Sequence, residues 1–313
     1  MFEIKRYEPS HEQAWNDFVA RSKNGTFLFD RRFMDYHSDR FADSSLMILR
    51  KGRIYALLPA NRVGDTLHSH QGLTYGGLLT DAKATAEGVM EAFGALNAWL
   101  RNKGVRRVTY KAMPWIYHRL PAEEDLYALT QVCHARLLTR EISSTILLQQ
   151  PLRFTESRKS GLRKALREGL YMEESGDLAA FWQMLDDNLA SRHHTHPVHS
   201  LDELRLLQGR FPQQIHLYLI YNKEKEPVGG TWVFDTGQVV HTQYIASTEE
   251  GKAHGALDLL FDELINRRYR EGIYLDFGKS TEEGGRVLNE HLIFQKEGFG
   301  GRGVCYDTYE WEP

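Results

Sequence analysis

The stretch YLDFGKSTEEG, residues 274–284, contains two short motifs of nucleotide-binding proteins. Gly-Lys-Ser-Thr is the ending of a phosphate-binding P-loop, but a P-loop needs a glycine five residues before its Gly-Lys pair, where this chain has Ile273. Asp-Phe-Gly holds magnesium in kinases, but that chemistry also needs a His-Arg-Asp loop upstream, and the sequence contains none. The spacing therefore excludes both interpretations.

Carboxylates at the end of this stretch are candidates for acid–base chemistry. Asp276 lies in a strand predicted at residues 273–278, which we expect to end at Gly278 because a β-carbon would hinder the turn there. One hypothesis is that Asp276 or Glu282 projects into a cleft as a general base. The alternative is that residues 280–283 start a helix, with a hydroxyl cap and two glutamates in the favourable first turn.

His199 is a further candidate base. It directly precedes a helix start, because Ser200 and Glu203 have the residue types and spacing of a capping box. An unperturbed imidazole pKa of about 6.5 suits proton removal near neutral pH. His199 belongs to a histidine-rich segment that lacks cysteine and precedes a proline in a predicted loop, so we expect no metal site there. Its members and the next histidine along the chain are His193, His194, His196, His199 and His216.

The stretch STEEGKAHGALDLL has features of an anion-binding loop before a helix. Gly251 and Gly255 would let the backbone approach an anion, and Lys252 would favour negative charge together with the helix N-terminus. These residues and Ala256 are therefore candidates for binding a phosphate. Two adjacent glutamates oppose that interpretation, and an ordinary capped helix start is the alternative.

Three more residues and one helix could contact a substrate. Tyr244 and, in the first half, Tyr75 could donate a hydroxyl proton, although a packed aromatic ring is the favoured explanation for each. Lys111 ends a predicted strand, where its ammonium could hold a carboxylate or a phosphate. The basic stripe of the helix predicted at 156–169 is either a solvated face or a contact for phosphates.

The elements that position these residues occur in the same order in both halves: a hairpin, a strand, a helix and a strand. In the first half the predicted ranges are 45–63, 68–79, 83–103 and 105–114. In the second half they are 215–222 with 227–234, then 238–247, 253–271 and 273–278. We therefore predict an α/β protein of two domains, 1–150 and 151–313, each with a mixed, mostly antiparallel sheet flanked by helices.

Composition restricts the classes of function. The 313 residues are 42% hydrophobic, which supports packed cores, and the formal charge of −3 gives no general attraction to nucleic acid. The two cysteines, Cys133 and Cys305, form no disulfide framework. No apolar run approaches the ~18 residues of a membrane span, and no signal peptide is evident. These features predict a soluble, cytoplasmic protein.

The block IYLDFGKSTEEGGRVLNEHLIFQKEGFGGRG resembles the end of the N-acetyltransferase (GNAT) fold, in which a strand is followed by a short helix and a Lys-x-Gly-Phe corner. Here the helix would be residues 287–294 and the corner Lys296, Gly298 and Phe299. With SRKSGLRKALREGLYMEES at the start of the second half, the layout is similar to the tandem-GNAT group. That group contains the Fem-type peptidoglycan aminoacyltransferases and the BioF2-like acyltransferases.

This resemblance implies transfer of an acyl group, acetyl foremost, from acyl-coenzyme A to the amine of a small molecule or of a peptide or glycan precursor. It implies that the sheet opens near Asp276 to admit the pantetheine arm, in the second domain. At the position where many GNAT enzymes carry a tyrosine that acts as a general acid, this chain has Phe294. We expect Gly255→Glu to abolish donor binding in a folded protein.

Two alternatives remain on the same fold. A Fem-type enzyme would take an aminoacyl group from tRNA and add it to a peptidoglycan precursor of the cell envelope. A non-catalytic module would bind a sugar–lipid or a peptide without turnover. Dependence on coenzyme A, on charged tRNA or on neither would separate them.

Overall fold

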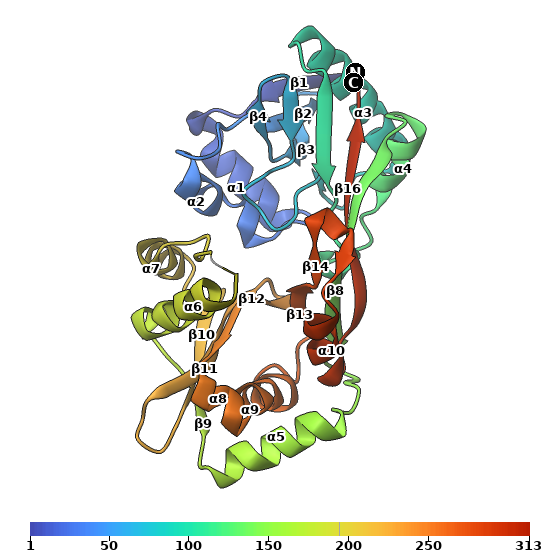
Figure 1. The fold of residues 1–313 in the computed structure, drawn as a ribbon. Helices are drawn as coiled ribbons and strands as arrows, with labels where there is room; N and C mark the ends of the chain where they lie inside the picture. The colour runs from blue at the N-terminus through green and yellow to red at the C-terminus, as the bar shows by residue number, and fades with distance from the viewer. Residues whose placement is uncertain (194) are drawn as a thin grey trace. The chain divides into compact units, whose positions relative to one another are not determined.

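The computed structural model of the protein describes residues 1–193 and 195–313, apart from the side chains of Arg192 and His193 (Figure 1). The chain forms two compact units, each built from more than one segment. Unit 1 consists of Met1–Ile142, Thr281–Val287 and Cys305–Pro313, and unit 2 of Ser143–Ser280 and Leu288–Val304. The boundary proposed at residue 150 differs from this division, because unit 2 already begins at Ser143 and two later segments belong to unit 1.

Unit 1 contains an antiparallel sheet in the order β1-β2-β3-β6 and a group of shorter strands. The sheet strands are β1 (Phe2–Arg6), β2 (Leu46–Arg50), β3 (Arg53–Leu58) and β6 (Leu79–Thr80). The others are β4 (Asn61–Val63), β5 (Thr66–His68), β7 (Arg107–Lys111), the earlier part of β8 (Arg136–Leu147), β14 (Thr281–Glu282) and the later part of β16 (Arg302–Trp311). The helices are α1 (Glu12–Arg21), α2 (Arg31–Met34), α3 (Ala86–Asn102) and α4 (Glu124–Gln131). The stripe of Val89, Phe93, Leu96 and Leu100 on α3 is buried, as its periodicity predicts.

Unit 2 contains a sheet in the order β8-β13-β12-β11-β10-β9. Its strands are β8 (Arg136–Leu147, from Ser143 onward), β9 (Tyr171–Glu174), β10 (Ile215–Tyr221), β11 (Pro227–Asp235), β12 (Val239–Ser247) and β13 (Tyr274–Lys279). Its helices are α5 (Glu156–Arg167), α6 (Leu178–His193), α7 (Leu201–Arg210), α8 (Glu249–His254), α9 (Ala256–Glu263) and α10 (Glu290–Gly298). A π-helical turn, Leu264–Arg268, extends α9. The two-residue strand β15 (Val287–Leu288) precedes α10.

Helices cover both faces of the unit 2 sheet. A β-carbon added to Gly229 would meet Ala256 of α9, whereas one added to Gly230 would meet Phe181 of α6. Successive strand residues point to opposite faces, so α9 and α6 lie on opposite sides of β11. The register of β11 with β12 then places Tyr244 on the α6 face, opposite Trp232.

Strands β12 and β13 form a fork. They are the parallel pair of this sheet, and they pair only from Val239–Tyr274 to His241–Asp276. Beyond this point β12 continues to Ser247 beside β11 alone, while a bulge in β13 and the positive φ of Gly278 (+73°) turn the other strand away. The backbone edge of β12 after His241 is therefore open, as the resemblance implies.

The segment after β13 differs from the expected helix start. Thr281–Glu282 is the short strand β14, and a 3₁₀ turn at Glu283–Gly285 follows it. The helix begins only at Glu290, where the Asn289 side chain accepts a hydrogen bond from the Leu292 N–H at 3.0 Å. Asn289 is itself a preferred cap residue, so the local signal for this helix start lies seven residues before the Lys-x-Gly-Phe corner.

Candidate functional site

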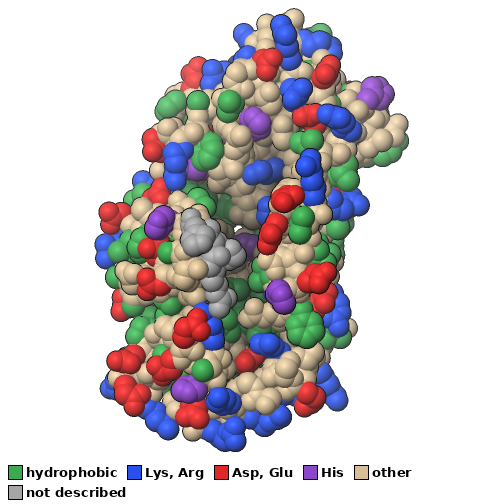
Figure 2. Space-filling view, in the orientation of Figure 1, with side chains coloured by type: hydrophobic (Ala, Val, Ile, Leu, Met, Phe, Trp, Pro, Cys, Tyr) green, Lys and Arg blue, Asp and Glu red, His purple; other side chains and the backbone are tan. Residues whose placement is uncertain are grey.

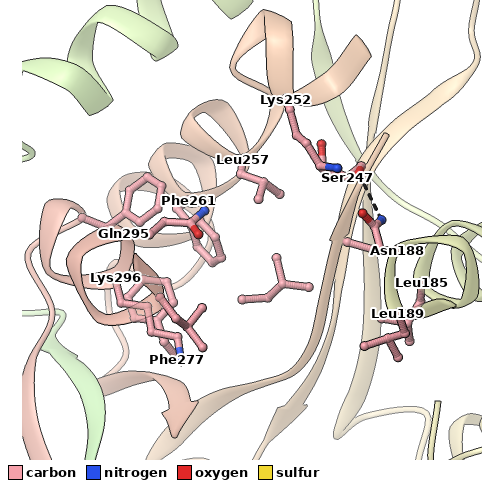
Figure 3. Close-up of a pocket in the computed structure, with 14 residues that line it drawn as sticks. Leu185, Asn188, Leu189, Ser247, Lys252, Leu257, Phe261, Phe277, Gln295 and Lys296 are labelled. Atoms are coloured by element: carbon pink, nitrogen blue, oxygen red, sulfur yellow. Dashed lines mark hydrogen bonds between the residues drawn. The ribbon is translucent and has the colours of Figure 1, made fainter. Parts of the chain in front are cut away.

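A cavity of about 430 Å³ lies at the fork between β12 and β13 in unit 2 (Figure 3). Its walls come from α6, the open end of β12, α8, α9, β13 and α10. The lining residues are Leu185, Asn188, Leu189, Ile245, Ala246, Ser247, Lys252, Leu257, Phe261, Phe277, Leu292, Gln295, Lys296 and Phe299. Most are apolar because the fork opens directly onto the core that Phe261, Phe277 and Phe299 share.

Lys296 brings a cation to one side of this pocket. Its Nζ donates hydrogen bonds to the carbonyl oxygens of Gly278 at 2.8 Å and Lys279 at 2.9 Å, and to Oγ of Ser280 at 2.9 Å. Burial lowers the pKa of Lys296 to about 8, while the nearby Asp276 carboxylate acts in the opposite direction. The ammonium is therefore charged at neutral pH and fixed at the end of β13.

Polar groups also border the other side of the pocket. Asn188 donates to the Ser247 carbonyl oxygen at 3.0 Å, and Lys252 lies beside them on α8 (Figure 3). The Lys252 ammonium pairs with the Glu249 carboxylate. The pocket is thus a mainly apolar slot with a lysine at each side.

The predicted phosphate loop folds into the short helix α8. The Thr248 hydroxyl caps it by accepting from the Gly251 N–H at 3.0 Å. A β-carbon on Gly251 would lie 1.9 Å from the Val228 carbonyl oxygen, and one on Gly255, whose φ is +78°, would lie 2.4 Å from that of Gly161. Close packing therefore already requires both glycines. Of the four predicted phosphate ligands, Lys252 lines the pocket.

His199 and Tyr244 are brought together on the α6 face of the sheet. The His199 Nδ1 lies 2.6 Å from the Tyr244 hydroxyl; His199 is buried and Tyr244 is half-buried. Burial raises the pKa of Tyr244 to about 12, so its hydroxyl stays protonated at neutral pH. The Trp182 indole donates to the His199 carbonyl oxygen at 3.0 Å and holds the loop in place. Two residues predicted independently as proton-transfer groups are thus hydrogen-bonded neighbours.

Asp276 is fully buried at the branch point of the fork. One carboxylate oxygen accepts from the hydroxyls of Ser143 and Thr145, the latter at 2.8 Å, and the other lies 2.8 Å from Nδ1 of His241. A carboxylate with these partners is held rigidly and can orient the imidazole. Asp276 is therefore placed to act through His241 and does not itself line the pocket.

The remaining predicted site residues belong to unit 1. Glu282 is exposed on β14. The Tyr75 ring is buried, with its hydroxyl 3.1 Å from that of Thr26. Lys111 donates to three backbone carbonyl oxygens, at 2.8–3.2 Å, of a single loop at residues 70–73. Through these contacts Tyr75 and Lys111 stabilise the fold of unit 1.

No group of three or more His, Cys, Asp and Glu residues that could hold a metal ion occurs in the described part of the chain. In the histidine-rich segment, His196 contacts Asp186 at 2.6 Å, His194 lies outside the described residues, and His216 pairs with Glu174 at 2.7 Å. None of the helices described is long and apolar enough to span a membrane.

Lys296 and His241 are candidate site residues that the sequence alone did not indicate. Lys296 was noted only as part of the Lys-x-Gly-Phe corner, and His241 was not singled out. The usable signal for Lys296 is a lysine between apolar helix positions and a glycine-rich corner, where a solvated charge is unexpected. No comparable local signal marks His241, because its partner Asp276 is distant in sequence.

Comparison with known proteins identifies the class of fold. A family model described as an acetyltransferase (GNAT) domain matches residues 155–284. The structure of FemX is similar with a TM-score of 0.68 at 11% identity, over 99% of this chain and 97% of FemX. The C-terminal domain of a putative lysylphosphatidylglycerol synthetase from Agrobacterium fabrum is similar with a TM-score of 0.62 at 13% identity, over 96% and 91% of the two chains.

A tandem GNAT protein from the clavulanic acid biosynthesis pathway is similar over 100% of this chain and 98% of that chain, with a TM-score of 0.51 at 12% identity. The protein therefore has the tandem-GNAT, Fem-like fold. At such low identities the likeness defines the fold, and no curated protein matches the sequence.

Proposed function

We propose that the protein is an N-acyltransferase that moves an acyl group, acetyl foremost, from acyl-coenzyme A to an amine. The observation that carries this proposal is the fork between β12 and β13, which opens an apolar slot beside a fixed ammonium group. A narrow, uncharged pantetheine arm suits such a slot, and the open edge of β12 offers backbone partners for its amides. The GNAT domain match at residues 155–284 supports this assignment.

In this reaction the amine nitrogen attacks the thioester carbonyl carbon, the carbon–sulfur bond breaks, and coenzyme A leaves as a thiolate. The proton that the amine loses balances the one that the thiolate takes up to become a thiol. Lys296 would stabilise the negative charge that develops on the carbonyl oxygen. His199 with Tyr244, or His241 held by Asp276, would remove the amine proton. We propose an acceptor amine on a small molecule or on a peptide or glycan precursor.

An aminoacyl-tRNA donor with a peptidoglycan-precursor acceptor is the second candidate. The segment where a coenzyme A pyrophosphate would bind favours this candidate, because it is poorly suited to an anion. Thr248 already caps α8, and the acidic Glu249 and Glu250 lie in the first turn of that helix. It is also consistent with the likeness to FemX. The two candidate functions differ in the donor, which is acyl-coenzyme A in the first and aminoacyl-tRNA in the second.

Thermal unfolding with coenzyme A, acetyl-coenzyme A and octanoyl-coenzyme A tests the first proposal. A ligand at a hundredfold excess over its Kd stabilises by roughly 2.7 kcal/mol, a rise in Tm of several degrees. The rise should be lost in Leu257→Trp, which fills the pocket, and kept in Leu206→Trp, which alters an exposed leucine of α7. Absence of a shift with all three ligands, together with turnover of charged tRNA, would transfer the assignment to the second candidate.

A further inference from the structure

We infer that the preferred donor presents its acyl group on the phosphopantetheine arm of a small acidic carrier protein, and that this protein docks on helix α5. The inference rests on the proposed acyl transfer and specifies its donor. Three features of unit 2 carry it: the end of the pocket at α8, the charges that line the pocket, and the exposed face of α5.

The first feature is that the hydrogen-bond donors at the start of α8 already have partners within the protein. The Gly251 N–H is bonded to the Thr248 hydroxyl at 3.0 Å, and the Lys252 N–H is bonded to the Thr248 carbonyl oxygen at 2.9 Å. The Lys252 ammonium is paired with Glu249, which is exposed at the start of α8. The backbone N–H groups and the lysine are therefore already paired, and the Glu249 carboxylate lies beside them. A nucleotide pyrophosphate would find few donors here and would be repelled by that carboxylate. The pantetheine part of the arm is uncharged, and a carrier protein adds one phosphodiester charge to it, whereas coenzyme A adds a pyrophosphate and a 3′-phosphate.

The second feature concerns the charges in the pocket. Among the fourteen described residues that line it, none is acidic, and the two charged ones, Lys252 and Lys296, are both cationic. An aminoacyl ester would bring its own ammonium group into this slot, between two lysines and without a carboxylate partner. An acyl thioester is neutral and matches the apolar walls. The pocket chemistry therefore favours an acyl-pantetheine over an aminoacyl-tRNA.

The third feature is the position of α5 against the pocket walls. Arg158 of α5 donates to the Asp258 carboxylate of α9 at 3.0 Å, and Gly161 packs directly against Gly255. At the start of α5, the Thr155 N–H bonds to the carbonyl oxygen of Gly298, the last residue of α10, at 2.9 Å. Helix α5 therefore lies behind the two helices that wall the pocket. A protein docked on the outward face of α5 would be separated from the slot by two helix layers, α5 and the helix that walls the pocket, at roughly 8–10 Å per layer.

The outward face of α5 fits an acidic protein. Arg163 and Arg167 are exposed, and Lys164 is half-buried beside them. Lys159 is also half-buried, and it pairs with Glu156 of the same helix at 2.8 Å. Figure 2 shows Lys and Arg side chains along the end of unit 2 where Figure 1 places α5. Leu166 lies between the two arginines with 55% of its surface exposed. An apolar residue enclosed by arginines is typical of a protein interface, whereas a phosphate backbone would leave it without a partner.

The test compares one acyl group on two carriers. Octanoyl amide analogues, which cannot react, are attached to an acidic acyl carrier protein and to coenzyme A, and binding to the full-length protein is measured by calorimetry. We expect the carrier protein to bind at least about tenfold tighter, and its affinity to fall with added salt. The double variant Arg163→Glu/Arg167→Glu should abolish that advantage and leave the coenzyme A analogue unchanged. The control Arg101→Glu/Arg106→Glu, at exposed arginines of unit 1, should change neither.

The outcomes separate this inference from the proposed function. If both analogues bind with equal affinity, compete for the pocket and bind the α5 variant as tightly as the unmodified protein, the carrier inference is overturned and acyl transfer stands. If neither binds and charged tRNA binds through α5, both are overturned. Equal loss of carrier binding in the unit 1 control would show an effect of net charge and would overturn the docking site.

Discussion

At the scale of single residues, burial decides which polar groups of unit 2 can act on a substrate. Asp276 is fully buried and fully hydrogen-bonded, so its influence must pass through His241. Lys296 is also buried but lines the pocket, and its hydrogen bonds fix the ammonium at the fork. The cost of burying that cation is visible in its lowered pKa.

Replacing Lys296 with methionine should reduce kcat by roughly 10²–10³-fold, because a fixed positive charge beside the developing oxyanion is lost. Lys252→Met removes the other lysine of the pocket and should change kcat by only a few fold. Steady-state kinetics on both variants, with circular dichroism to confirm folding, provides the measurement. Equal kcat losses in the two variants would contradict the role proposed for Lys296.

Lys296 should also make stability depend on pH at the alkaline end. Its pKa is about 8 in the folded chain against 10.5 in the reference state, so the unfolded chain binds more protons between these pH values. The free energy of unfolding should therefore rise with pH across this window, by up to roughly 3 kcal/mol relative to Lys296→Met. Urea titrations at pH 7.5 and 10 measure the difference between the two proteins. A constant difference would show that the pKa of Lys296 is not lowered.

At the scale of elements, close packing of α5 against the junction of α8 and α9 shapes the pocket wall. Gly255 has a left-handed backbone and lies against the Gly161 backbone. Gly278 has a similar φ, but the nearest atom to a β-carbon there would be His241 Cε1 at 3.4 Å, an ordinary contact distance. The expectation that Gly255→Glu leaves the fold intact is therefore withdrawn, because any side chain at this position must separate α5 from α9.

Gly255→Ala should destabilise the protein more than Gly278→Ala. Both substitutions place alanine at a positive φ, at a cost of about 1–3 kcal/mol, but Gly255→Ala adds a clash between backbones. Denaturant unfolding of the two variants gives the comparison directly. A smaller loss for Gly255→Ala would mean that α5 can move away from α9 at little cost.

At the scale of the whole molecule, each unit is completed by a segment distant in sequence. Strand β13 pairs with the Ser143–Leu147 part of β8, and Asp276 takes two of its hydrogen bonds from that part. The helix α10 that carries Lys296 follows a segment that belongs to unit 1. A cut between the halves at residue 150 therefore removes a strand from unit 2.

A fragment of residues 143–313 should accordingly be more stable than a fragment of residues 151–313. The shorter one lacks the pairing of Leu147, Ile146 and Thr145 with β13 and leaves the buried Asp276 carboxylate short of donors. Melting temperature and resistance to proteolysis, measured on both fragments, test this. Indistinguishable fragments would show that β8 contributes little to unit 2.

The sequence alone predicted the features that depend on neighbours along the chain. The periodic stripe of α3 is buried, and the capping box of Ser200 and Glu203 is formed, because each needs only residues within a few turns. The mixed α/β fold followed from the repeated order of elements and from the Lys-x-Gly-Phe corner. The start of α10 was misplaced because several hydroxyl and amide residues before it could serve as caps.

The tertiary structure alone decided the candidate site. The hydrogen bond between His199 and Tyr244 joins residues 45 positions apart, and that between Thr145 and Asp276 joins residues 131 apart. The pocket itself exists because two strands stop pairing after three residues, which no local pattern encodes. Burial of Lys296 and Asp276 likewise depends on which elements pack over them. Local sequence sets propensities and caps, whereas the geometry and charge of a site come from contacts between segments that are distant along the chain.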